Sequence, residues 1–122
     1  MKALQRGLAS VLLPVMGLMC GCHSYHVDAR VENRTGEAIT LLEVDYPSAS
    51  FGLDKLDAGA DYHYRFQIRG SGPMKVQYTE RKSLQVRQIK GPDLKEGQQG
   101  RLDIVLLPEG KVEFRPELTP QP

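Results

Sequence analysis

Thiol and imidazole side chains gather in one short stretch near the N-terminus. The chain's two cysteines are Cys20 and Cys22, and two of its three histidines follow at His23 and His26. Cysteine and histidine bind soft metal ions, and a cysteine is also a point of lipid attachment. A disulfide between the two cysteines is disfavoured, because a single intervening residue would strain it. Two chemistries remain open: lipidation, and a metal site formed by Cys22, His23 and His26.

The residues before the cysteines predict an export signal. Residues 1–7 contain Lys2 and Arg6 and no acid, and residues 8–19 are mostly apolar. Those twelve residues would rise about 18 Å as a helix, which is less than the roughly 30 Å hydrocarbon core of a bilayer. A basic start, a short apolar run and small residues after it are typical of a cleaved signal peptide.

The segment Met19-Cys20-Gly21-Cys22 resembles the lipobox of bacterial lipoproteins. It departs from that motif by Met19 in place of leucine and by Cys20 in the middle position. The resemblance implies cleavage before Cys22, a diacylglycerol on its sulfur, and an acyl chain such as palmitate on its amino group. It also implies a membrane-anchored protein of the bacterial cell envelope. His23 stands where an aspartate would favour the inner membrane, so the expected location is the outer membrane, facing the periplasm.

The expected domain organisation follows from this cleavage. Residues 1–21 are the signal peptide, residues 22–115 one domain that begins with an anchor stem at 22–24, and residues 116–122 a flexible, proline-rich tail. Without Lys2 and Arg6, 14 of the 16 basic residues remain, against 15 acidic ones. This near-neutral balance predicts no nucleic-acid partner.

Alternating apolar and polar residues predict β-strands. In residues 62–69, Tyr62, Tyr64, Phe66 and Ile68 alternate with polar side chains, so the two sets lie on opposite faces of a strand. Residues 25–32, 74–79, 102–107 and 112–114 follow the same pattern. The parity also changes within residues 39–46, which predicts either a strand covered in part on both faces or a β-bulge at Leu41–Leu42. A parity change within residues 84–89 predicts a β-bulge near Gln88.

Turn-forming residues separate these strands. Gly, Asn, Ser and Pro stand between the alternating runs, and no segment after Cys22 has a clear helical period. We expect an all-β fold, an antiparallel β-sandwich of about seven short strands that is immunoglobulin-like in the broad sense. A small β-barrel is the main alternative. Residues 47–57 could carry an additional short strand, and residues 90–100 are expected to form a loop.

Five basic residues fall near the polar faces of consecutive strands. If those strands pair in order, the side chains would share one surface suited to an anionic glycan, a lipid headgroup or an acidic protein. The alternative is a solvated face whose charges discourage aggregation. The candidate residues for an anionic partner are Arg65, Arg69, Lys75, Arg81 and Arg87.

Catalytic motifs are not apparent in the sequence. It lacks a nucleophile elbow, a phosphate loop and a dinucleotide fingerprint, and His63 lies among arginines on a predicted polar face. We therefore expect no enzymatic activity and no cofactor. The leading hypothesis is a lipid-anchored envelope module that binds a partner or assists assembly. The alternatives are a metal-handling envelope protein that uses Cys22, His23 and His26, and a small envelope enzyme.

Overall fold

The computed structural model describes residues 25–120. The predicted signal peptide, the lipidation site Cys22 and the candidate metal ligand His23 lie outside the described residues. Within residues 25–120, no helix is long and apolar enough to span a membrane. The strands are β1 (Val27–Asn33), β2 (Ile39–Tyr46), β3 (Ala49–Leu56), β4 (Asp61–Phe66), β5 (Gly72–Glu80), β6 (Val86–Leu94), β7 (Gln99–Leu106) and β8 (Val112–Thr119), with a short 3-10 turn, η2 (Pro108–Gly110), before β8.

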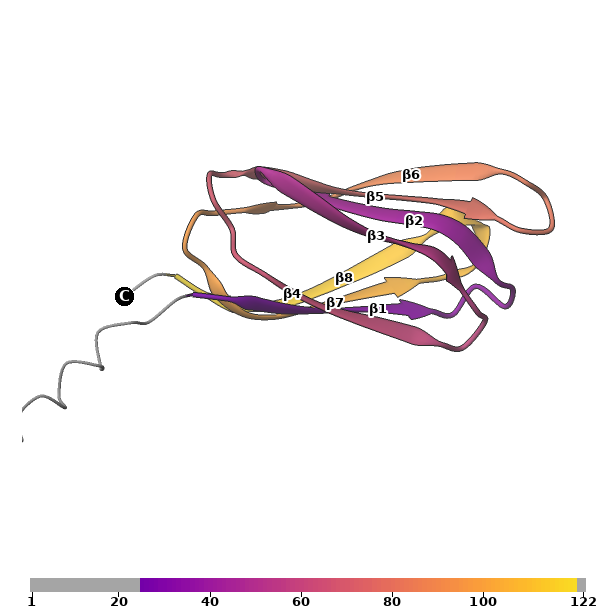
Figure 1. The fold of residues 1–122 in the computed structure, drawn as a ribbon, viewed down its shortest axis with the longest axis horizontal. Helices are drawn as coiled ribbons and strands as arrows, with labels where there is room; N and C mark the ends of the chain where they lie inside the picture. Colours follow the sequence, from indigo (N-terminus) through magenta and orange to yellow (C-terminus); the bar gives the residue numbers. More distant parts are fainter. Residues whose placement is uncertain (1–24, 121–122) are drawn as a thin grey trace, which may run out of the picture.

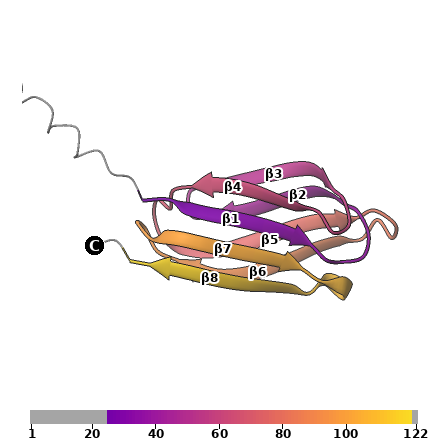
Figure 2. The ribbon, with the colours of Figure 1, turned by 90° about the horizontal axis from the view of Figure 1, so that it is seen from below.

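These strands form two four-stranded sheets packed face to face. The strand orders are β4-β1-β7-β8 and β3-β2-β5-β6, and the two layers are visible in Figure 1 and Figure 2. Neighbouring strands are antiparallel except for β1 and β7, which run parallel. The β-sandwich is therefore confirmed. It has one strand more than the expected seven, because most of residues 47–57 forms the full strand β3.

The core lies between the sheets and follows the alternation in the sequence. Val27, Ala29 and Val31 of β1 face inward, as do Val76 and Tyr78 of β5. Removing such side chains from water stabilises the fold by about 25 cal/mol for each Å² of apolar surface. The period-two pattern thus predicts the inner face of these strands correctly.

A bulge interrupts β2, as its parity change predicts. The register between β2 and β5 shifts between Thr40 and Glu43, and Leu41 has a φ of 52° and is 63% exposed. Gly52 pairs with Glu43 on the other side of the bulged strand. A Cβ added at Gly52 would lie 2.6 Å from the Leu42 carbonyl oxygen, so the bulge requires glycine there.

The predictions for residues 84–100 are wrong in part. Gln88 pairs in regular register with Gln77, and the irregularity of β6 falls between Lys90 and Asp93 instead. Residues 90–94, expected to be a loop, continue β6 and bury Leu94. A bulge around the Gly91–Pro92 pair lets the strand continue where such residues would ordinarily end it.

The expected flexible tail at 116–122 is also wrong for residues 116–119. These residues form the end of β8, where Pro116 pairs with Leu102 of β7. β8 is an edge strand, and an edge tolerates a proline because one side of the strand needs no ladder hydrogen bonds. The folded domain therefore extends to Thr119, beyond the expected boundary at residue 115.

Candidate functional site

The fold separates the five basic residues that were expected to share a surface. β4 and β5 are consecutive in the chain but belong to different sheets, so the expected in-order pairing is wrong for these two strands. Arg65 lies on the outer face of one sheet and Lys75 on the outer face of the other, while Arg81 lies in the turn after β5. The continuous basic face is not formed.

Arg87 points inward rather than outward. It pairs with the buried Tyr78 of β5, which places it on the inner face of β6. Its Nε lies 3.1 Å from Oε2 of Glu80, and the Arg87 side chain is only 26% exposed. The sequence pattern failed here because Leu84 and Val86, taken as inner residues, are exposed in and beside the turn.

Glu80 completes this ion pair within a hydrogen-bond network. The Ser83 hydroxyl donates to Glu80 Oε1 at 2.8 Å, and Arg87 Nη2 donates weakly to the same oxygen at 3.5 Å. These bonds, first from Ser83 and then from Arg87, hold the pKa of the Glu80 carboxyl below its usual value. The charge of Arg87 is therefore paired within the fold with that of Glu80.

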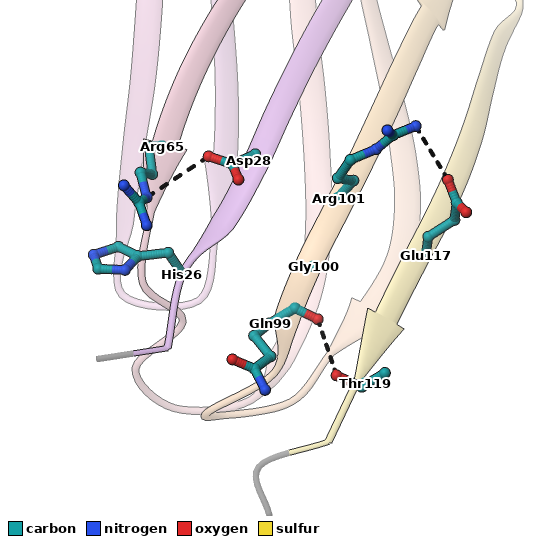
Figure 3. Close-up of a pocket in the computed structure, with 8 residues that line it drawn as sticks. All are labelled: His26, Asp28, Arg65, Gln99, Gly100, Arg101, Glu117 and Thr119. Atoms are coloured by element: carbon teal, nitrogen blue, oxygen red, sulfur yellow. Dashed lines mark hydrogen bonds and ion pairs between the residues drawn. The ribbon is translucent and has the colours of Figure 1, made fainter. Parts of the chain in front are cut away.

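Ion pairs balance the outer face of the β4-β1-β7-β8 sheet. Figure 3 shows Arg65 beside Asp28 and Arg101 beside Glu117, at N···O distances of 3.6 and 3.2 Å. These four residues line a cavity of about 450 Å³ together with His26, Gln99, Gly100 and Thr119. Because its charges are mixed, this surface is not suited to an anion.

Arg65 and Arg69 meet at a second cavity, of about 330 Å³, between the β2–β3 turn and the end of β4. We call it the aromatic–arginine pocket. None of the described residues that line it is acidic, whereas the cavity in Figure 3 includes Asp28 and Glu117. The pocket is lined by His26, Tyr46, Ser48, Ala49, Tyr64, Arg65, Phe66, Gln67 and Arg69.

Stacked aromatic rings form one side of the aromatic–arginine pocket. Tyr46 of β2 stacks on Phe66 of β4 with ring centroids 4.0 Å apart. Tyr64 of β4 stacks on Phe51 of β3 at 4.4 Å. The two phenylalanines are buried and Tyr64 is 37% exposed. Both pairs cross from one sheet to the other, so the tyrosines close the side of the sandwich where edge strands β3 and β4 lie.

The polar groups of the pocket are mainly hydrogen-bond donors. Arg69 Nη2 donates to Gln67 Oε1 at 2.8 Å, and no carboxylate in residues 25–120 pairs with Arg69. Burial, and then the nearby Tyr64, raises the pKa of Tyr46, so the Tyr46 phenol keeps its proton at neutral pH. The pocket therefore presents two cations and several hydroxyls. Arg69 has no carboxylate partner among the described residues, whereas Arg65 also pairs with Asp28 outside the pocket at 3.6 Å.

Ser48 has an unusual backbone conformation at the rim of this pocket. It is the third residue of the turn Tyr46-Pro47-Ser48-Ala49 and has a φ of 76°. A proline at the second position and a positive φ at the third are typical of a type II turn, which favours glycine or asparagine at the third. A serine there costs about 1–2 kcal/mol, and such outliers often mark functional sites.

Metal ligands do not cluster in the described part of the chain. No group of three or more His, Cys, Asp or Glu side chains between residues 25 and 120 could hold an ion. His26 lines the aromatic–arginine pocket, apart from the outer-face His63, whose Nε2 lies 3.6 Å from Asp61 Oδ2. The hypothesis of a metal site depends on Cys22 and His23, which are not described.

Sequence patterns alone did not single out Tyr46, Ser48 and Tyr64 as site residues. Tyr46 and Ser48 precede Tyr64 by 18 and 16 positions, and only the packing of the two sheets brings them to one cavity. The one local signal was the Pro47-Ser48 pair, which predicts a turn but no ligand.

Comparison with known proteins supports the fold. The chain resembles a protein from Eubacterium rectale whose structure was solved by NMR, with a TM-score of 0.54 and 16% sequence identity. The match covers 80% of this chain and 90% of that one. No family model and no curated protein matches the sequence. At this identity the likeness concerns the fold alone.

Proposed function

We propose that this protein is a lipid-anchored component of the bacterial cell envelope and binds an anionic envelope component without catalysing a reaction. The lipobox-like segment supports acylation of Cys22 and a place in the outer membrane, facing the periplasm. The observation that supports binding of an anion is that Arg65 and Arg69 line a pocket whose described residues include no acid. A pocket lined by two cations and no acid favours an anionic ligand.

The site would lie close to the membrane surface. His26, which lines the pocket, is four residues after Cys22 in the sequence. An extended chain spans at most about 3.6 Å per residue, which limits the separation of their Cα atoms to about 14 Å. An acylated Cys22 would thus keep the pocket near the headgroups and the glycans attached to them.

The anchor is tested by the intact mass of protein extracted from a bacterial membrane fraction. We expect the mass of residues 22–122 plus acyl chains, and a soluble protein when Cys22→Ala is expressed, because two or three acyl chains give firm membrane binding whereas one gives little. A full-length mass without lipid would contradict the anchor. Metal analysis of that thiol-bearing protein would then test Cys22, His23 and His26 as ligands.

Binding is tested with a polyanionic glycan at low and high salt. We expect affinity to fall as NaCl rises, since screening weakens exposed charge interactions, and to be lost in the double variant Arg65→Glu, Arg69→Glu. The matched control is Lys75→Glu, Arg81→Glu, which reverses two exposed charges away from the pocket. Equal loss in both double variants, or no loss in either, would contradict a role for this site.

A further inference from the structure

We propose that the aromatic–arginine pocket binds one sugar ring that carries a carboxylate or a phosphate. This inference rests on the proposed function, because it names the kind of anion that the same site accepts. Three features of the pocket carry it: its size, its stacked tyrosines and its set of hydrogen-bond donors.

The size of the pocket suits a single small ring. Its volume of about 330 Å³ lies at the lower end of the roughly 300–1,000 Å³ typical of small-molecule sites. The pocket is bounded on one side by the β2–β3 turn and on the other by the last residues of β4. A long glycan could therefore insert one residue while the remainder stays outside.

The tyrosines provide a surface for the apolar face of a sugar. Tyr46 and Tyr64 each stack on a buried phenylalanine, which fixes their orientation, and both residues line the cavity. The C–H groups on one face of a pyranose pack well on such rings, while tyrosine keeps a hydroxyl for hydrogen bonding. An anion without a ring, such as inorganic phosphate, would leave this surface uncovered.

The donors select an anionic sugar over a neutral one. Guanidinium groups bind carboxylate and phosphate with paired hydrogen bonds. Arg69 offers one that pairs with no carboxylate among the described residues, and Arg65 offers a second, exposed one that also contacts Asp28 at 3.6 Å. The Ser48 hydroxyl has no hydrogen-bond partner within the residues described, and it lines the same cavity. We assign the guanidinium groups to the anion and the Ser48 hydroxyl to a ring hydroxyl.

Because Ser48 has a left-handed conformation, a substitution there can reduce binding without reducing the stability of the fold. Glycine adopts this backbone without the steric conflict of a side chain, so Ser48→Gly should retain or raise the melting temperature. The same substitution removes a hydroxyl from the pocket. A variant that is at least as stable yet binds less tightly cannot be explained by partial unfolding.

The experiment measures binding of four compounds to the full lipoprotein in detergent micelles by calorimetry and by tyrosine fluorescence. The chain has no tryptophan and five tyrosines, two of which line the pocket, so the emission reports directly on the site. The compounds are glucuronate, glucose 6-phosphate, glucose and inorganic phosphate. We expect the two anionic sugars to bind at least about tenfold more tightly than glucose or phosphate, since a hydrogen bond to a charged group contributes that much or more.

Three single substitutions test whether glucuronate binds in the pocket. Arg69→Gln should weaken glucuronate binding about tenfold or more, and Ser48→Gly about threefold or more. Arg101→Gln is the matched control, because Arg101 is an exposed arginine outside the pocket. This variant should bind glucuronate as tightly as the parent protein does. An equal loss in Arg101→Gln would overturn the assignment.

The outcomes distinguish this inference from the proposed function. Phosphate or glucose binding as tightly as the anionic sugars would overturn the sugar assignment. If no sugar binds but the polyanionic glycan still binds in a manner sensitive to Arg65 and Arg69, the proposed function stands and this inference fails. If neither binds, both fail. Vesicles bearing a glucuronate-headed glycolipid identify the source: tighter binding than to soluble glucuronate indicates a lipid headgroup, and equal affinity a soluble glycan.

Discussion

Two arginines on opposite ends of the sandwich have opposite surroundings. Arg69 precedes β5, and Glu80, the partner of Arg87, ends it, so nine residues of strand, about 30 Å, separate the two sites. Arg87 packs against Gly110, where an added Cβ would lie 2.9 Å from its Cδ. Arg69 is exposed and bonds only to the amide of Gln67 among the described residues.

The role of an arginine therefore depends on the groups that surround it. No pattern in the sequence distinguishes Arg69 from Arg87. A largely buried pair such as Arg87–Glu80 is costly to break, because removal of one partner leaves the other charge unpaired away from water. Replacement of an exposed arginine that has no carboxylate partner changes the free energy of unfolding little. Such an arginine remains available to a ligand.

The largest expected effect is on stability, from Arg87→Ala. We expect the free energy of unfolding to fall by about 2–4 kcal/mol, because Glu80 loses its partner and the cavity beside Gly110 opens. Arg69→Ala, the matched arginine at the other end, should change it by less than about 0.5 kcal/mol. Urea denaturation monitored by circular dichroism measures both. Similar losses in the two variants would remove the contrast between the two ends.

The second effect is on affinity, from the double variant Arg65→Glu, Arg69→Glu. Reversal of both charges should weaken binding of the polyanionic glycan at least about 100-fold, or about 2.7 kcal/mol. Glu80→Gln, which disturbs only the far end, should leave affinity unchanged at a temperature where it is folded. A comparable loss of affinity in Glu80→Gln would mean that the two ends do not act separately.

The third effect is the response of stability to acid. Hydrogen bonds from Ser83 and Arg87 lower the pKa of Glu80 in the folded state, so the unfolded state binds its proton first as pH falls. The contribution of Glu80 is therefore fully present above its ordinary pKa of about 4.5 and is lost as pH falls through the lower folded value.

Urea titrations between pH 3 and 6 test this contribution. Glu80→Gln should lose less stability on acidification than the parent protein. Glu113→Gln is the control: a hydrogen bond and then the charge of Arg115 lower the pKa of Glu113, but both side chains are about half exposed, so solvent screens the pair. A steeper acid dependence in Glu80→Gln than in the parent would refute the assignment.

The smallest effect is the one that Ser48→Gly should have on stability. Relief of the left-handed strain at Ser48 gains about 1–2 kcal/mol, and the added freedom of glycine in the unfolded chain offsets about 0.4–1 kcal/mol of it. The net gain should be roughly 0.5–1 kcal/mol, seen as a higher midpoint in urea. Gly110→Ala gives the opposite sign at the far end, since Gly110 has a φ of 72° and contacts Arg87.

Local patterns predicted the strands but not every boundary. The alternation in residues 62–69 placed Tyr62, Tyr64 and Phe66 on the inner face correctly, and the parity change near Leu41 located a real bulge. The pattern misplaced Arg87, because Leu84 and Val86 supply the right alternation while lying in and beside an exposed turn. Side-chain type indicates which face a residue prefers, but a shift of one residue in register reverses that face.

Local sequence patterns are sufficient to predict a β-sandwich, because period-two alternation and turn residues depend only on neighbouring positions. The resemblance of Met19-Cys20-Gly21-Cys22 to a lipobox is likewise a local property of the sequence. Packing of the two sheets, by contrast, brings Arg65 and Arg69 to the same pocket as Tyr46, Ser48 and Tyr64. It places Lys75, Arg81 and Arg87 elsewhere. The physical reason is that strand order and register are set by packing between residues distant in sequence, which no local pattern encodes.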